Sequence, residues 1–389
     1  MLQTALERLQ RLWPAASFQI LTNAPDKLKI HCPGAVGVPW RGCKRWLAAG
    51  ALPRWMFPNF PQKTHRACPL TLDRLPRLAR LMWPPDGLAA RRFAEALFNS
   101  DLLVMSGCGL ITDAFRINAL RFLDTLAAAE RCGIPTAMLG QGLGPIQDGK
   151  LFRRAGEVLP RVGAIFIRER QASLDLLKQL GVPEAKTFVT GDDTVECAFH
   201  QNRPTPGNRI GVNLRITDYS ALDGEILETV RATLAEKARL HQTTLAGIPI
   251  LRSGAASDPQ TLRQLIGDEN TGDHLATPLE VIRRVSDCRV VVTGSYHAGV
   301  FALAQGIPVV GINRSAYYRD KFQGLAGEFG AGCVVLEADG AEFSQQLSAA
   351  IDELWEGAAE LKPELLAAAE RQIKAAQAAY ARLPALLRR

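Results

Sequence analysis

The chain has 389 residues, of which 47% are hydrophobic and 22% charged, and its formal charge is +7 at pH 7. This composition excludes an intrinsically disordered chain, and the length fits two domains better than one. The basic residues are spread along the chain and form no single stripe interleaved with aromatics. This pattern argues against a nucleic acid partner and favours a phosphorylated metabolite or an anionic membrane surface.

The spacing of the cysteines and the character of the first residues indicate the cellular compartment of the protein. The eight cysteines are scattered, without a C-x-x-C pair or a zinc-like spacing, so we expect reduced thiols and no bound metal. Residues 1–14 are charged and amphipathic, which predicts a helix and not a signal peptide. The uncharged stretch 290–312 contains glycine and proline, which predicts strand, helix and strand in place of a membrane span. We therefore expect a cytoplasmic protein, with peripheral association at the inner membrane face left open.

Strand and helix signals alternate through the first half of the chain. Strands are predicted at residues 18–22, 101–105, 136–140, 164–168 and 187–190, and helices at 114–132 and 171–180. Such alternation is typical of a parallel sheet that is covered by helices on both faces.

A polar segment rich in Pro and Gly, residues 201–208, predicts a linker to a second domain. Beyond it, strands are predicted at 209–213, 244–248 and 289–293, and helices near 222–240, 259–265, 277–286 and 363–386. Thr277 and Glu280 form a capping box at the start of the third of these helices. We expect two Rossmann-like α/β domains that face a cleft, at residues 1–200 and 209–350, followed by a helical segment at 351–389.

The segment 290–312 is the most informative for function. A buried strand is predicted to end at Thr293, Gly294 permits a sharp turn, and a helix begins near Ser295. The N–H groups and dipole at such a helix start suit a phosphate or carboxylate, and the carboxyl ends of parallel strands are where open α/β sheets bind ligands. His297 would then lie at the mouth of an anion site. A core histidine that hydrogen-bonds a nearby carbonyl is the alternative.

The next segment, 313–325, follows another strand end and brings three cations together with two tyrosines. Arg314, Arg319 and Lys321 could hold an anion, and Tyr317 and Tyr318 could stack on a sugar ring. Solvated surface side chains are the simpler interpretation of each residue taken alone.

Glycine-rich loops follow two predicted strands of the first domain, at 106–113 and 140–145. They could let a ligand approach the backbone, or they could be tight turns without a ligand. Neither has the spacing of a Walker loop or a dinucleotide-binding fingerprint, so ATP and NAD are not indicated.

Charged residues close two further strands. Arg168 and Glu169 follow the strand at 164–168, where they could line a cleft or mark the exit of the chain to water. Asp192 and Asp193 lie in a turn, where Asx-type capping is the simpler role and acid–base chemistry or cation binding the alternative.

With these segments in order, the chain resembles the polysaccharide pyruvyl transferase family from about residue 101 to 329. The matched segments are Gly107 and Gly109, Gly140-Gln-Gly-Leu-Gly-Pro145, Arg168-Glu169 with Ser173 and Gly181, Gly191-Asp-Asp193, Asn213-Leu-Arg215, and Ser295-Tyr-His-Ala298 through Gly306-Ile-Pro308 to Lys321. The specificity lies in their order and spacing. The resemblance implies a two-domain architecture similar to GT-B glycosyltransferases, with substrates in the cleft.

The resemblance also implies the reaction, in which phosphoenolpyruvate gives its pyruvyl group to a sugar as a cyclic ketal. The acceptor would be a bacterial surface polysaccharide or its lipid-linked oligosaccharide precursor, and no cofactor is expected besides the donor substrate. His297 would be the general acid, and Arg168 and Lys321 would bind the phosphoenolpyruvate anion. The further substrate-binding candidates are Arg215, Ser295, Gly107, Gly109, Gln141 and Arg319.

Two features depart from the family. Many members have arginine two residues before the histidine, where this chain has Ser295, so that cation is either missing or replaced by Arg314 or Arg319. Members commonly open with a strand and a glycine-rich loop ahead of the first helix, whereas Met1 already lies in the predicted helix. Two other functions stay open. A GT-B-type glycosyltransferase that uses a nucleotide sugar has a similar layout, and a helix start suits a diphosphate equally well. A non-catalytic binding subunit of a polysaccharide assembly complex would account for the missing opening loop.

Overall fold

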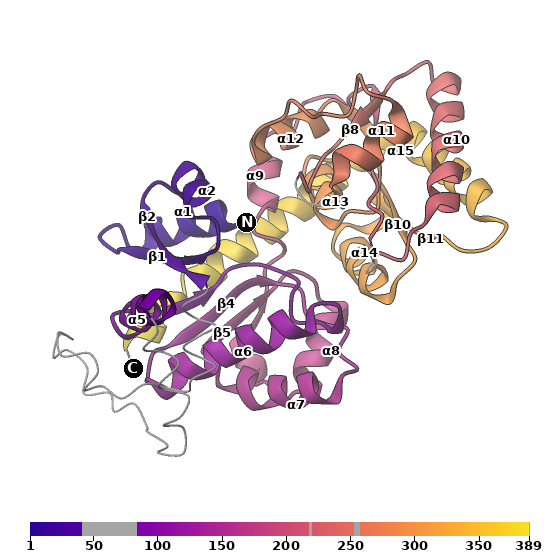
Figure 1. Ribbon diagram of the computed structural model, residues 1–389. Helices are drawn as coiled ribbons and strands as arrows, with labels where there is room; N and C mark the ends of the chain where they lie inside the picture. The colour runs from indigo at the N-terminus through magenta and orange to yellow at the C-terminus, as the bar shows by residue number, and fades with distance from the viewer. Residues whose placement is uncertain (41–83, 218–219, 253–256, 389) are drawn as a thin grey trace. The chain divides into compact units, whose positions relative to one another are not determined.

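The computed structural model describes residues 1–40, 84–217, 220–252 and 257–388 (Figure 1). The chain forms two compact units. Unit 1 comprises Met1–Phe166, Leu176–Phe188 and Ala378–Arg389, and unit 2 comprises Ile167–Asp175 and Val189–Gln377. Each unit is described below by itself.

Unit 2 contains a five-stranded sheet with the order β11-β10-β9-β7-β8, in which the strands pair in parallel. The strands are β7 (Arg209–Asn213), β8 (Leu245–Gly247), β9 (Cys288–Thr293), β10 (Val309–Asn313) and β11 (Cys333–Glu337). Counted from β7, this is the doubly wound order 2-1-3-4-5, whose topological switch point lies between β7 and β9. Ligands of such sheets bind outside the carboxyl ends of the strands at that point.

Helices connect and cover these strands. They are α9 (Val195–Phe199), α10 (Gly224–Leu240), α11 (Asp258–Ile266), α12 (Pro278–Val285), α13 (Tyr296–Leu303), α14 (Ala316–Phe329) and α15 (Phe343–Tyr380). The predicted capping box is present at α12, where Thr277 accepts a hydrogen bond from the Glu280 N–H and the Glu280 carboxylate accepts from the Thr277 N–H. The turn chemistry of the sequence therefore sets where α12 starts.

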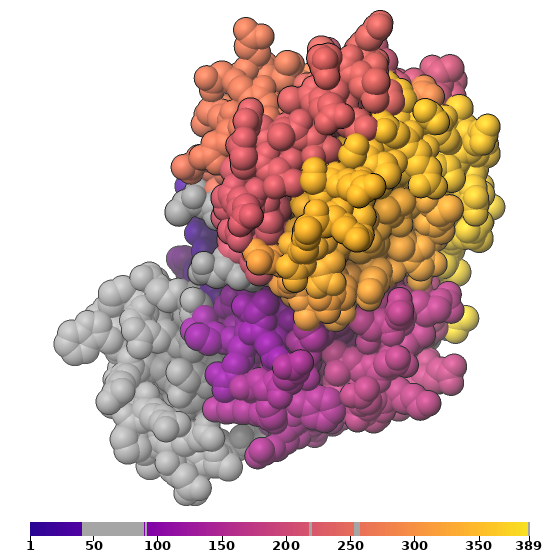
Figure 2. Space-filling model, turned by 90° about the vertical axis from the view of Figure 1, so that its right-hand side faces the viewer, coloured from indigo at the N-terminus to yellow at the C-terminus, as the bar shows by residue number. Residues whose placement is uncertain are grey.

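The core of unit 2 lies between the sheet and two of its helices. Val212, Val292 and Val310 of three neighbouring strands form one cluster with Leu234 of α10 and Leu347 of α15. Figure 2 shows α10 and α15 side by side on one face of the molecule. Burial of these β-branched strand residues is the main force that holds the unit together.

Unit 1 contains two groups of strands. One pairs β1 (Phe18–Thr22) in parallel with β2 (Ala35–Pro39), and the other has the order β3-β4-β5-β6. The second group comprises β3 (Leu103–Met105), β4 (Thr136–Gln141), β5 (Ala164–Ile167) and β6 (Thr187–Val189). The helices are α1 (Leu2–Leu12), α2 (Pro25–His31), α5 (Pro84–Phe98), α6 (Arg116–Arg131), α7 (Gly149–Val158) and the second part of α8 (Gln171–Gln179), whose start belongs to unit 2. The predicted α/β class, with parallel strands flanked by helices, is confirmed.

The end of the chain packs in unit 1. Tyr380 and Leu383 are buried in a cluster with Leu9 of α1, Leu139 of β4 and Phe166 of β5. The Tyr380 ring also stacks under the Arg8 guanidinium, 5.0 Å away. The last residues therefore return to the first compact unit, although the segment that precedes them belongs to unit 2.

Two details differ from the sequence prediction. The predicted linker 201–208 lies inside unit 2, where the Asn208 N–H donates to the Asp287 carbonyl and Arg203 pairs with the Asp287 carboxylate, so these bonds fix it to the unit. The last helix begins at Phe343 instead of residue 363, and Pro363 lies within it. Proline breaks isolated helices, but the adjacent Lys362 is buried and donates to the Gln305 carbonyl, so packing carries α15 through this position.

No helix in the described ranges combines the length and the apolar character that a bilayer span requires.

Candidate functional site

The candidate site lies at the carboxyl end of β9, beside the switch point of unit 2. The turn after this strand is fixed by Thr293, whose hydroxyl accepts a hydrogen bond from the Ser295 N–H at 2.8 Å. A Cβ on Gly294 would lie 3.1 Å from the Leu214 side chain, so glycine lets the turn pack closely against that side chain. Ser295 is the N-cap of α13, so His297 lies in its first turn, as predicted.

Four side chains of unit 2 come together at this turn. The Arg168 Nη1 lies 3.4 Å from Asp192 Oδ2, and His297 Nε2 lies 3.8 Å from the same oxygen. The Arg168 guanidinium covers the Tyr296 ring, with 3.9 Å from Cζ to the ring centroid. One carboxylate oxygen therefore faces both the guanidinium and the imidazole.

The other oxygen of Asp192 has a structural role. Oδ1 accepts hydrogen bonds from the Thr194 N–H at 2.9 Å and from the Thr194 hydroxyl at 2.7 Å. This is the Asx-type turn that the sequence predicts. The turn presents Oδ2 to Arg168 and His297, so capping and the site share one side chain.

Burial and charge set the protonation states of this pair. Burial raises the pKa of Asp192, but the nearby His297 and Arg168 outweigh it, and the pKa is lowered overall. Burial lowers the pKa of His297 to about 4; Asp192 opposes this shift, while Arg168 and Lys321 add to it. The imidazole is therefore neutral at pH 7 in the ligand-free protein, and the carboxylate is charged.

Tyr296 is a buried phenol beneath the guanidinium. Burial raises its pKa, so it stays protonated. Its hydroxyl has no hydrogen-bond partner among the described residues, and such buried polar atoms are rare in native proteins. The hydroxyl is thus a donor and acceptor that a bound molecule can satisfy.

Lys321 of α14 is half-buried, and its ammonium borders the same ring. Its Nζ lies 5.9 Å from the Tyr296 centroid and 3.6 Å from the Tyr317 centroid, and it donates to the Tyr317 hydroxyl. Tyr317 and Tyr318 are buried side by side, with an interplanar angle of 75°. The two rings therefore pack around Lys321 in place of the predicted exposed platform for a sugar.

Glu169 holds the frame behind the cluster. Its carboxylate accepts hydrogen bonds from the N–H groups of Ala172 and Ser173 and from the Ser173 hydroxyl, which caps the start of α8. Burial still raises its pKa above the ordinary glutamate value. A Cβ on Gly324 of α14 would lie 2.8 Å from the Glu169 side chain, so a glycine lets the two segments approach.

Two predicted cations of the same unit are held by carboxylates outside this cluster. Arg215 makes two hydrogen bonds to the fully buried Asp258, at 2.7 and 3.0 Å. Arg319 pairs with Glu337. Arg314, the other proposed substitute for a family arginine, pairs with Asp223.

The remaining predicted residues belong to unit 1. Gln141 is buried, and its amide donates to the carbonyls of Met105, Ser106 and Leu139. It thereby ties the loop of Gly107 and Gly109 to β4, and the Gly142 N–H adds a bond to the Cys108 carbonyl. In unit 1 the side chain of Gln141 thus supports the backbone of the glycine loop.

Asp192 and Tyr296 were not among the predicted site residues. Asp192 lies within a segment matched to the family, but from sequence alone the capping of its turn was a sufficient reason for an aspartate at this position. Tyr296 adjoins His297, and a tyrosine next to a predicted acid carries no sequence signal of its own. Among the described residues, no three His, Cys, Asp or Glu side chains are grouped so that they could hold a metal ion.

Comparison with known proteins identifies relatives. A family model described as polysaccharide pyruvyl transferase matches residues 5–316. No curated protein sequence matches the chain.

Solved structures share the fold at low sequence identity. The glycotransferase of kitacinnamycin is 14% identical with a TM-score of 0.55, and 99% of this chain and 95% of that chain are covered. The calicheamicin glycosyltransferase is 14% identical with a TM-score of 0.51, covering 100% and 94%. The UDP-GlcNAc 2-epimerase of Neisseria meningitidis is 13% identical with a TM-score of 0.50, covering 96% and 94%. These neighbours support the GT-B-like fold, and at this identity they carry no further conclusion.

Proposed function

Because the chain belongs to the polysaccharide pyruvyl transferase family, we propose that it transfers a pyruvyl group from phosphoenolpyruvate to a sugar of a bacterial surface polysaccharide or its lipid-linked precursor. The product is a cyclic pyruvate ketal. The observation that carries the proposal is the geometry at the start of α13, where His297 and Arg168 share the Asp192 carboxylate in a cluster that Lys321 borders.

The charges of the cluster suit the donor. Arg168 and Lys321 supply two positive charges beside the carboxylate of Asp192, and the positive end of the α13 dipole adds to them. A phosphate and a carboxylate on one small molecule are matched by such a site. Arg168 and Tyr296 are both buried, whereas Lys321 and His297 are partly exposed.

The reaction requires one proton delivery to carbon. A sugar hydroxyl oxygen forms a bond to C2 of phosphoenolpyruvate and gives its proton to water, while the methylene carbon takes a proton from the protonated His297. The imidazole is then reprotonated from water. The bond from C2 to the phosphate oxygen then breaks, and phosphate leaves with the electron pair. A second sugar hydroxyl adds to C2, closes the ketal, and gives its proton to the departing phosphate.

His297 is suited to the proton delivery once the donor is bound. The imidazole is neutral in the free protein because burial outweighs the effect of Asp192. The negative charges of phosphoenolpyruvate act in the same direction as Asp192 and raise the pKa, so we expect His297 to take up a proton on binding and to pass it to the methylene carbon.

Deletion of the gene in the source bacterium tests the function and does not require the acceptor sugar to be identified first. The surface polysaccharide of the deletion strain should lose acid-labile pyruvate, and the wild-type gene should restore it. A gene that encodes His297→Gln should not restore it, because loss of a positioned acid lowers turnover by about 10²- to 10⁴-fold. Unchanged pyruvate content in the deletion strain would refute the proposal.

Binding assays separate the donor classes. Thermal unfolding with phosphoenolpyruvate and, separately, with UDP- and GDP-sugars should show stabilisation by phosphoenolpyruvate alone. Stabilisation by a nucleotide sugar and not by phosphoenolpyruvate would favour a glycosyltransferase instead.

A further inference from the structure

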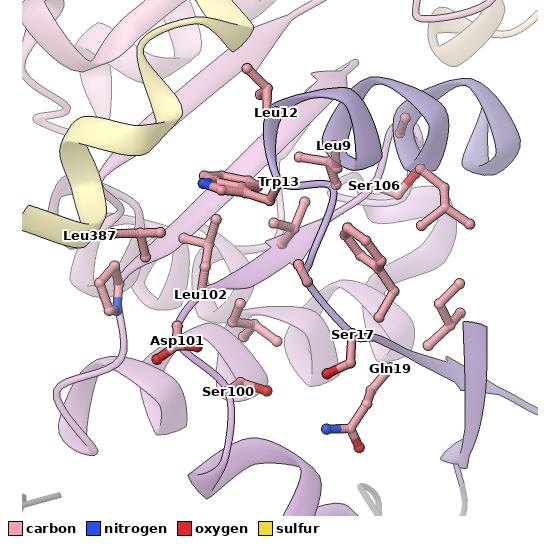
Figure 3. Close-up of a pocket in the computed structure, with 18 of the residues that line it drawn as sticks. Leu9, Leu12, Trp13, Ser17, Gln19, Ser100, Asp101, Leu102, Ser106 and Leu387 are labelled. Atoms are coloured by element: carbon pink, nitrogen blue, oxygen red, sulfur yellow. The ribbon is translucent and has the colours of Figure 1, made fainter. Parts of the chain in front are cut away.

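Unit 1 contains a cavity of about 770 Å³ whose lining is mainly apolar. Figure 3 shows Leu9, Trp13 and Leu102 around it. Asp101 is the one charged side chain among the described residues that line it. Such a lining does not suit an anionic molecule, whereas the cluster at the start of α13 in unit 2 has two cations beside one aromatic ring.

The ring is that of Tyr296, the first residue of α13. Its centroid lies 3.9 Å from Cζ of Arg168 and 5.9 Å from Nζ of Lys321. Both distances are within the reach of a cation–π interaction, which extends to about 6 Å. One side chain is therefore an aromatic neighbour of both cations that the proposed donor site uses.

The packing of two helices of unit 2 brings these residues together. Gly299 lies one turn after Tyr296 on the same face of α13, and a Cβ there would lie 3.2 Å from the Leu325 side chain of α14. Lys321 precedes Leu325 by one turn on the same face of α14. The glycine lets the helices approach, so that Lys321 of one helix reaches Tyr296 of the other.

The guanidinium of Arg168 lies in a place from which water is excluded. Only 2% of the side chain is exposed, and Nη1 lies 3.4 Å from Asp192 Oδ2. This ion pair is long, because charge-assisted hydrogen bonds to a carboxylate usually measure about 2.7 to 2.9 Å. A cation–π contact is strongest where the cation is desolvated, and a planar guanidinium stacks on an aromatic face. The ring of Tyr296 therefore restricts where the guanidinium can lie.

The hydroxyl of Tyr296 does not anchor the residue. Its oxygen is buried without a hydrogen-bond partner among the described residues, which by itself destabilises a fold. The ring is thus the part of the side chain that interacts with the cations. A direct contact between the hydroxyl and a bound donor is the alternative.

We propose that Tyr296 is a positioning residue of the donor site, whose ring holds the Arg168 guanidinium in place beside Lys321. The proposal rests on the proposed function, since it assigns both cations to phosphoenolpyruvate. Like charges repel, and an electron-rich ring near both cations offsets part of that repulsion. The cations are thereby preorganised, so that a donor does not have to order them when it binds.

The NMR signal of the Arg168 Nε–Hε group tests the position of the guanidinium without a ligand. A proton above a ring face resonates upfield, so the Hε signal, identified by its loss in Arg168→Lys, should be shifted upfield in the wild type. Tyr296→Phe keeps the ring and should keep the shift, whereas Tyr296→Leu should lose it. An unshifted signal in the wild type would overturn the proposal, even if Tyr296→Leu did not fold.

Calorimetric titration with phosphoenolpyruvate gives the second readout. Tyr296→Phe should bind within about threefold of the wild type, and Tyr296→Leu at least about tenfold more weakly, the scale of a desolvated cation–π contact. Phe329→Leu is the matched control and should bind as the wild type does, because it removes a buried ring of α14 that borders no cation in the described part of the chain.

Two results of the titration would overturn the proposal. If Tyr296→Phe bound as weakly as Tyr296→Leu, the hydroxyl and not the ring would be responsible. If Phe329→Leu lost as much affinity as Tyr296→Leu, the effect would come from general loss of packing. A wild type that does not bind phosphoenolpyruvate would instead refute the proposed function, while the Hε signals would still show whether the ring holds Arg168.

Discussion

Asp192 shows how one side chain can serve both the fold and the site. Oδ1 closes the turn through Thr194, and Oδ2 faces Arg168 and His297. The sequence predicts the first role, because Asx capping is a local pattern. It does not predict the second, because Arg168 is 24 residues away and the contact depends on how the strands are ordered. The positions of His297 and Lys321, on the helices that follow β9 and β10, could be predicted from sequence because each helix begins just after a strand end.

Replacing Asp192 with Asn should lower the pKa of His297 further, because the carboxylate is the group that raises it. With less protonated imidazole available, the alkaline limb of the pH–rate profile, where the general acid loses its proton, should shift to lower pH and turnover should fall. The measurement is the pH dependence of turnover together with NMR titration of the His297 ring.

Thr194→Val is the matched control for that variant. It removes the hydroxyl bond to Oδ1 and leaves the charge of Asp192 in place. It should lower the melting temperature without moving the His297 titration. If both variants moved the titration equally, the effect would belong to the turn and not to the carboxylate.

The depressed pKa of His297 makes stability depend on pH. The unfolded chain binds a proton at this residue near pH 6.5, whereas the folded protein does so near pH 4. Unfolding therefore takes up a proton in this window, and the free energy of unfolding falls as the pH drops from about 6.5 to 4, by at most about 1.4 kcal/mol per pH unit for this group. Asp192, whose folded pKa is lowered, adds a loss of stability at still lower pH.

In His297→Gln, urea unfolding measured between pH 7.5 and 4.5 should show a shallower loss of stability than in the wild type. An identical pH slope in the two proteins would mean that the histidine is not held neutral by the fold.

At the scale of elements, most strands were predictable to within two residues because apolar runs between turn residues are a local signal. α15 was not, since the packing around Lys362 that carries it through Pro363 is a tertiary effect. The close packing of α14 against the start of α8 could not be predicted from sequence either. It depends on the contact between Gly324 and Glu169, which are far apart in the chain.

Gly324→Ala should destabilise unit 2, because the new Cβ would lie 2.8 Å from the Glu169 side chain. The expected loss is about 1 to 3 kcal/mol, the usual cost of overpacking. Gly327→Ala in the same helix is the matched control, because nothing lies within 4 Å of its Cβ position. It should gain about 0.4 to 1 kcal/mol. Urea unfolding of both variants measures the difference, and equal effects would mean that the contact with Glu169 does not constrain α14.

At the scale of the molecule, the alternating pattern was enough to predict an α/β chain, and the described sheets confirm it. Strand order was not accessible, because pairing between strands far apart in sequence leaves no local trace. In unit 2 that order puts Asn213 and Thr293 side by side at the switch point, and the His297 turn follows directly. Predicting the site as a whole therefore required the topology in addition to the motifs.

The positive charge of the cluster should be needed for donor binding. Lys321→Ala should weaken phosphoenolpyruvate binding by about 1.5 to 3 kcal/mol, the scale of a charge-assisted hydrogen bond. Lys374→Ala, which removes a lysine with a 78% exposed side chain from the same unit, is the matched control and should bind as the wild type does. Equal affinity of all three proteins would exclude Lys321 from the donor site.

The most direct test of the account is calorimetric titration of the protein with phosphoenolpyruvate at pH 7 in two buffers of different ionisation enthalpy. The account predicts binding that takes up protons, because the donor's negative charge raises the pKa of a histidine that is neutral beforehand. The uptake should vanish in His297→Gln while binding remains. Binding with no proton uptake, or uptake that persists in His297→Gln, would contradict the assignment of His297 as the acid that the donor charges.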